Sequence, residues 1–177
     1  MASGLQTTPP SKPKVLILDR FFFPDEQATS VYLTELVEGL SSSFEFTVLS
    51  GPPVVVTENL KKKPLGAKIF QVPSFRFSKP RLFFRFLNDL SFLKIALLKG
   101  LFLPRPHLLL SQTSPPGIWW VGFLLSRWHR VPWIHVSKDV FPENLRVLAE
   151  GRAPFLFQLL EKINRWVLKK ADRVLVI

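Results

Sequence analysis

The sequence predicts an α/β domain in which a parallel sheet is covered by helices on both faces. Two features of the 177-residue chain predict it: short apolar runs that end at a polar residue, and amphipathic segments that alternate with them. The length suits one ordinary domain, and a hydrophobic fraction of 47% excludes general disorder. Residues 14–177 are expected to form this domain. Residues 1–13, polar and Pro-containing, are expected to be a disordered lead-in and not a signal peptide.

The apolar runs are the expected strands. They are Lys14–Asp19, Glu45–Leu49, Ala67–Val72, His107–Ser111, Pro132–Val136 and Arg173–Ile177. The expected helices lie between them, at Gln27–Ser42, within Pro80–Leu103, at Gly117–Arg127, from about Pro142, and at Pro154–Lys170. Asp25 is placed to cap the first helix, whose apolar residues recur at helical spacing. Strands and helices of these lengths in alternation are typical of a parallel sheet.

Composition narrows the classes of partner. The formal net charge is +11, from 24 basic and 13 acidic residues, which favours a polyanionic partner: nucleic acid, an anionic membrane face or a phosphorylated substrate. The chain has no Cys and three scattered His, so disulfides, thiolate chemistry and a metal site are not expected. No nucleic-acid motif is present, and the aromatic residues fall on core-like spacing, so nucleic acid ranks below the membrane.

The first loop that follows a strand is a candidate ligand-binding segment. In sheets of this kind ligands bind at the carboxyl ends of the strands, where loops lead into helices. The candidate substrate-binding residues of this loop are Phe23, Pro24, Asp25, Glu26 and Gln27. No Gly occurs between Pro13 and Glu38, so the dinucleotide fingerprint G-x-G-x-x-G is excluded. An ordinary capped turn with its Phe residues in the core is the alternative.

Two later loops occupy the same position. One carries Thr113, Ser114 and Gly117, which either cap the next helix or form a hydroxyl-binding edge. The other carries Lys138, Asp139 and Glu143 at one strand end. A carboxylate there is suited to act as a base towards an acceptor hydroxyl, although charges at a helix start are also ordinary capping.

A basic amphipathic segment separates the third and fourth expected strands. Leu and Phe recur in it at three- and four-residue spacing, as a core helix requires. The same segment is typical of a helix that lies on an anionic leaflet, and opposite faces can serve both roles. The candidate membrane-contact residues are Arg76, Lys79, Arg81, Phe83, Phe84, Arg85 and Lys94.

Four stretches in order resemble the N-terminal domain of bacterial family-4-type glycosyltransferases. They are F-F-F-P-D-E-Q-A-T-S-V-Y-L-T-E-L followed by F-T-V-L-S-G, then L-L-L-S-Q-T-S-P-P-G, then V-P-W-I-H-V-S-K-D-V-F-P-E, and finally A-D-R-V-L-V-I. The resemblance covers about Lys14 to Ile177. It implies the Rossmann-like, acceptor-side, N-terminal half of a GT-B fold. It departs from the family at Glu26 and Gln27, where a Gly pair is common, and at Lys138, where some relatives have His.

The resemblance also implies a function. It implies sugar transfer from a nucleotide-sugar to a lipid-linked or polysaccharide acceptor, with Asp139 as the catalytic residue of the acceptor side. No cofactor is expected on this chain, because the family binds the donor mainly in a C-terminal domain that these residues do not include, and the chain alone is expected to be inactive. The expected location is the cytosolic face of the membrane. The alternative is a truncated or split membrane-associated scaffold that binds a partner donor domain without catalysis.

Overall fold

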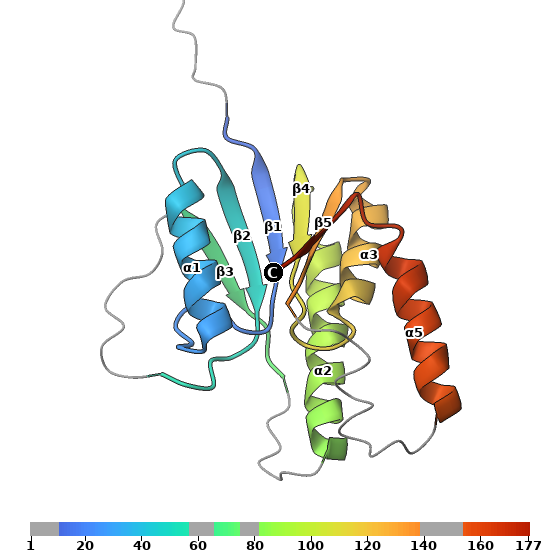
Figure 1. The fold of residues 1–177 in the computed structure, drawn as a ribbon. Coiled ribbons are helices and arrows are strands. Elements are labelled where there is room, and N and C mark those ends of the chain that lie inside the picture. The colour runs from blue at the N-terminus through green and yellow to red at the C-terminus, as the bar shows by residue number, and fades with distance from the viewer. Residues whose placement is uncertain (1–10, 57–65, 75–81, 139–153) are drawn as a thin grey trace, which may run out of the picture.

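The computed structural model describes residues 11–56, 66–74, 82–138 and 154–177, and these form one parallel six-stranded sheet with helices on both faces. The strand order is β3-β2-β1-β4-β5-β6, and every neighbouring pair is parallel. The strands are β1 (Lys14–Leu18), β2 (Glu45–Ser50), β3 (Ala67–Gln71), β4 (Leu108–Ser111), β5 (Trp133–Ser137) and β6 (Arg173–Val176) (Figure 1). This order confirms the predicted Rossmann-like α/β fold.

Helix α1 covers one face of the sheet, and the other described helices cover the opposite face (Figure 1). The helices are α1 (Ala28–Leu40), α2 (Leu82–Leu101), α3 (Ile118–His129) and α5 (Pro154–Leu168). All of these bounds lie close to the predicted ones. The helix expected from about Pro142 lies outside the described residues.

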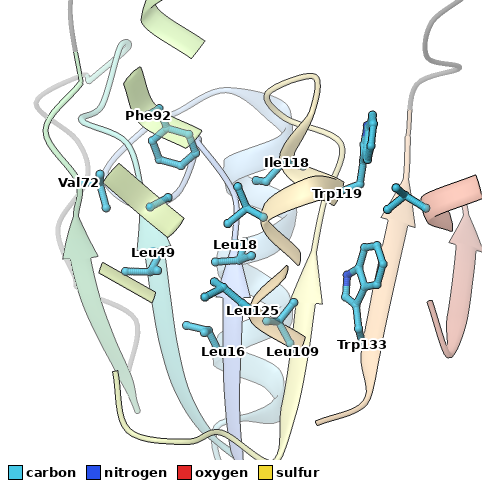
Figure 2. Packing of buried hydrophobic residues seen from close by; sticks show 13 residues of the cluster. Leu16, Leu18, Leu49, Val72, Phe92, Leu109, Ile118, Trp119, Leu125 and Trp133 are labelled. Atoms are coloured by element: carbon cyan, nitrogen blue, oxygen red, sulfur yellow. The ribbon is translucent and has the colours of Figure 1, made fainter. Parts of the chain in front are cut away.

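The strict alternation of side chains along β1 supplies both faces of the sheet. Val15 and Ile17 pack in the cluster beneath α1, whereas Leu16 and Leu18 pack in the cluster beneath α2 and α3 (Figure 2). Each large apolar side chain that is fully buried stabilises the fold by about 1.5–3 kcal/mol. The same alternation, continued past the end of β1, directs Asp19 towards the α1 face and Arg20 towards the α2 face.

A buried polar chain lies under α3. The indole Nε1 of Trp133 donates to Ser111 Oγ at 2.8 Å, and Ser111 Oγ lies 2.9 Å from His135 Nδ1. Desolvation by burial lowers the pKa of His135 to about 4, so the imidazole in this chain is neutral at neutral pH. Gly122 permits this packing, because a Cβ at that position would lie 2.7 Å from Trp133 Nε1.

Candidate functional site

The carboxyl ends of β1 and β4 form the centre of the candidate site. The two strands are neighbours, but the chain leaves β1 towards α1 on one face and leaves β4 towards α3 on the other. In doubly wound sheets this switch point opens a crevice in which ligands bind. The side chains that follow these strands therefore decide what the edge can bind.

Three polar residues form a row across this edge. Leu18 is paired with Leu49 on one side and with Ser111 on the other, so the next residues, Ser50, Asp19 and Gln112, follow in the same register. Alternation turns all three towards the α1 face. Each is no more than 1% exposed. The row is thus a buried polar layer directly beyond the apolar core under α1.

The row contains oxygens without a hydrogen-bond partner among the residues that the structure describes. They are Asp19 Oδ2, Ser50 Oγ and Gln112 Oε1, and Ser30 Oγ in the first turn of α1 is a fourth. The large majority of buried side-chain polar atoms in folded proteins are paired, so three without a partner at neighbouring strand ends, with a fourth on α1, are exceptional. Two hydroxyls, an amide oxygen and a carboxyl are suited to hydrogen bonds with the hydroxyl groups of a ligand. We call the three residues at the strand ends, together with the buried Ser30 of α1, the polar row.

Asp19 is the titratable member of the polar row. Its Oδ1 accepts the N–H of Phe21 at 3.0 Å. Desolvation by burial is the largest influence on Asp19 and raises its pKa from 3.8 to about 7. The backbone hydrogen bond from Phe21 and the charge of Lys138 lower this pKa, whereas the charge of Asp25 raises it. A carboxyl with a pKa near neutrality can exchange a proton with a ligand hydroxyl at physiological pH.

The second and third predicted loops meet at this edge. The backbone N–H of Lys138 donates to Thr113 Oγ1 at 2.7 Å, and that hydroxyl donates to the carbonyl of Val136 at 3.1 Å. The ammonium of Lys138 lies 4.7 Å from the centre of the Tyr32 ring on α1. Lys138 therefore spans the switch point from β5 to α1. Asp139 and Glu143 lie outside the described residues.

The first predicted loop is attached to the segment that follows β2. The two carboxylate oxygens of Asp25 accept the N–H groups of Gln27 and Val54 at 3.0 and 2.7 Å, and the N–H of Glu26 donates to Val55. The prediction that Asp25 caps α1 is wrong, because the cap residue is Gln27 and Asp25 instead joins two loops. The neighbouring Phe residues partly support the alternative interpretation of this loop, in which its Phe side chains pack in the core.

Phe22 is 1% exposed in the core cluster under α1, and the predicted Phe23 packs against that cluster. Pro24 is half-buried beside them. Core packing thus accounts for the aromatic part of the loop. Of the polar part, Asp25 is buried, and Gln27 lines a cleft.

A cleft of about 510 Å³ lies on the α2 side of the same edge. Its lining residues are Arg20, Phe21, Gln27, Val54, Arg85, Asn88, Asp89, Ser114, Pro115 and Pro116. The cleft therefore brings together two of the predicted substrate-binding residues, Gln27 and Ser114. Gly117 lies just beyond it as the N-terminal cap of α3, with a left-handed φ of 90° that favours glycine.

The predicted membrane-contact residues separate into two groups. Arg85 lines the cleft, and Lys94 is exposed further along α2, while Phe84 is half-buried. Arg76, Lys79 and Arg81 lie outside the described residues, as does the side chain of Phe83. A membrane role for Arg85 thus competes with a role in the cleft.

The polar row and Arg20 were not among the predicted site residues. Except for Ser30, these residues belong to a visible signal, polar residues directly after an apolar run, as in K-V-L-I-L-D-R, F-T-V-L-S and L-L-L-S-Q. That signal indicates the strand ends. It does not indicate that the three ends meet in register, which depends on the strand order.

Comparisons with known proteins identify the family. The sequence profile of the family described as "Glycosyl transferase 4-like domain" matches residues 28–177. Among solved structures, the C-terminal domain of a hydrogenase from Pyrococcus furiosus is similar with a TM-score of 0.45 and 18% identity, over 75% of this chain and 99% of that chain. UGT2 of Phytolacca americana, complexed with UDP-2fluoro-glucose and pterostilbene, is similar with a TM-score of 0.47 and 15% identity.

The match to UGT2 covers 80% of this chain and 34% of that chain, so this chain corresponds to about a third of that protein. No curated protein matches the sequence. The family profile, in contrast, extends from the start of α1 through β6. The chain belongs to the family of glycosyl transferase 4-like domains.

Proposed function

We propose that this chain is the acceptor-side domain of a glycosyltransferase that transfers a sugar from a nucleotide-sugar to a lipid-linked or polysaccharide acceptor. The observation that supports this role is the polar row at the switch point of a domain of this family. Its unpartnered hydroxyl, amide and carboxyl oxygens complement the hydroxyl groups of a sugar. A purely structural edge would be expected to pair them.

The chemistry of transfer gives the row a role. An acceptor hydroxyl forms a bond to the anomeric carbon of the donor, the bond from that carbon to the nucleotide phosphate breaks, and the hydroxyl proton needs a base. In our proposal Asp19 or Asp139 orients the acceptor hydroxyl and receives this proton. The pKa of Asp19, about 7, suits that role at neutral pH. Lys138 is proposed to contact a phosphate group at the same edge.

We place donor binding in a second, C-terminal domain, so turnover by residues 1–177 alone is not expected. The test is therefore made with this chain joined to or mixed with a donor-binding domain of the same family. Asp19→Asn and Asp139→Asn are compared with Glu38→Gln, which removes a carboxylate from the exposed side of α1. We expect at least one of the two Asp variants to lower kcat at least 100-fold with little change in the control, as expected for loss of a general base. Unchanged turnover in both would remove the polar row and Asp139 from the chemistry.

A second candidate function is a membrane-associated scaffold that holds a partner donor domain without catalysis. One observation favours membrane contact: α2 exposes Phe86, Leu90 and Leu98, and Phe102 directly follows the helix. Their exposed fractions are 60, 48, 48 and 86%, and their spacings of four or eight residues place them along one side of the helix. The exposed Lys94 lies within the same stripe. Each such cation contributes about 1 kcal/mol near an anionic leaflet. No helix in the described part of the chain is both long and apolar enough to cross a bilayer.

Vesicle flotation tests this contact. We expect binding to anionic vesicles, weakened by added salt, and little binding to neutral vesicles. Replacement of Phe86 and Phe102 by Ser should reduce binding, whereas replacement of the exposed Val31 on α1 by Ser is the control. Equal binding to neutral and anionic vesicles would contradict electrostatic attachment.

A further inference from the structure

We propose that the cleft on the α2 side of the sheet edge is a binding site for an oxyanion, a phosphate or carboxylate group, which the acceptor carries. The statement that this oxyanion belongs to the acceptor rests on the proposed function. The binding of an oxyanion by the cleft rests on the geometry of its own residues. The cleft has a volume of about 510 Å³, within the usual size range of small-molecule sites. Its polar lining consists of two arginines, two amide side chains, a hydroxyl and the carboxylate of Asp89.

Arg20 is held in place at the end of β1. It follows Asp19, so alternation along the strand turns it to the opposite face of the sheet, where its guanidinium forms an ion pair with Asp89 on α2. The guanidinium also lies 5.7 Å from the centre of the Phe21 ring. Its side chain is 16% exposed, so the group is partly desolvated and well oriented. A fixed guanidinium loses little entropy when it binds a planar or tetrahedral oxyanion.

Arg85 supplies the second charge. It precedes Asp89 by one helical turn, so the two residues share a face of α2, and both line the cleft. Arg85 is exposed, and none of the ion pairs among the described residues includes it. Because Asp89 offsets Arg20, the cleft keeps a net charge of about one cation, which arises from Arg85.

The remaining lining suits an organic carrier of the oxyanion. Gln27 and Asn88 contribute amide groups and Ser114 a hydroxyl, whereas Pro115, Pro116 and Val54 form apolar walls. Arg20 and Asp19 are consecutive residues. The cleft and the polar row therefore flank the same strand end, one on each face. A ligand that lies across the edge would place an anionic group by Arg20 and Arg85 and its hydroxyls by the polar row.

The test measures oxyanion binding by the chain itself, without donor domain or turnover. Inorganic pyrophosphate and glucuronate are titrated into the chain by calorimetry at low and at moderate salt. We expect one of them to bind, and the tighter of the two assigns a phosphate or a carboxylate. Arg85→Gln should weaken that binding at least tenfold and Arg85→Lys less, because lysine keeps the charge but not the forked geometry.

Lys94→Gln is the matched control, because Lys94 is exposed on the same helix but does not line the cleft. Urea unfolding shows whether each variant keeps its fold. Equal weakening by Arg85→Gln and Lys94→Gln, or no binding of either anion by the unmodified chain, would overturn the proposal. Failure of the proposed function is seen separately, as normal turnover in Asp19→Asn and Asp139→Asn.

Discussion

Replacing Asp19 by Asn should make this domain more stable, and by an amount that depends on pH. Asp19 is 0% exposed, and burial raises its pKa from 3.8 to about 7. A carboxyl whose pKa is higher in the folded chain than in the unfolded chain binds more protons when folded. Its contribution to stability is then present below pH 4 and is lost as the pH rises through 7.

The magnitude follows from the two pKa values. At pH 8 the carboxylate is charged in both states, and the difference between 3.8 and about 7 corresponds to about 4 kcal/mol of destabilisation. At pH 5 the folded chain keeps the proton, and the corresponding cost is about 2 kcal/mol. An amide of the same shape avoids both costs. Asp19→Asn should therefore stabilise the domain by about 2–3 kcal/mol more at pH 8 than at pH 5.

Urea unfolding of both proteins at pH 5 and pH 8 measures this difference. The buried His135 titrates in the same range but is present in both proteins, so it cancels in the comparison. Glu38→Gln serves as the control for loss of an exposed carboxylate. An equal effect of Asp19→Asn at the two pH values, or a loss of stability at pH 8, would refute the assignment of a buried carboxyl titrating near neutrality. A gain in stability together with a loss of turnover would be typical of a functional residue.

Further predictions concern packing, the buried histidine and the membrane. Gly122→Ala should destabilise the domain by about 1–3 kcal/mol in thermal or urea unfolding, because the new methyl group would lie 2.7 Å from Trp133 Nε1. Gly39 lies on α1, and a Cβ added there would meet no other part of the fold within 4 Å. Gly39→Ala should therefore stabilise the domain by about 0.5–1 kcal/mol, and destabilisation there would contradict the described packing. His135→Gln should flatten the fall in stability between pH 6.5 and 4, because the pKa of His135 is lowered to about 4 and the unfolded chain alone takes up the proton. Replacing the exposed Phe86 by Ser should lower binding to anionic vesicles without changing the unfolding midpoint; an unchanged vesicle affinity would argue against contact through α2.

Much of the fold could be predicted because the local patterns are strong and agree with one another. The run K-V-L-I-L before Asp19 is apolar throughout, as a strand buried on both faces requires, and it forms β1. The α2 segment repeats Leu and Phe at helical spacing and forms a helix of 20 residues. The one wrong local prediction, Asp25 as a cap, failed because its carboxylate reaches Val54, a residue 29 positions away in the chain.

The candidate site was less predictable. The loops were expected at the right edge, and Lys138 and Thr113 do meet there. The strongest features of that edge, the polar row and the cleft, combine residues of β2, α1 and α2 with residues that directly follow β1 and β4. No spacing within the sequence relates these residues, since they are brought together only by strand register and by the packing of helices on the sheet.

By itself, the sequence determined the element types, their order and the family resemblance, because these depend on residues that are near one another in the chain. The tertiary structure alone decided that Asp19 is buried between Ser50 and Gln112. It also decided that Arg20, the next residue, lies with Arg85 and Asp89 of α2 in the cleft on the opposite face. The physical reason is the period of two in a strand. Because of this period, Asp19 lies in the desolvated layer under α1, whereas Arg20 lies in the cleft on the α2 face. These two environments exist only once the helices have packed on the sheet.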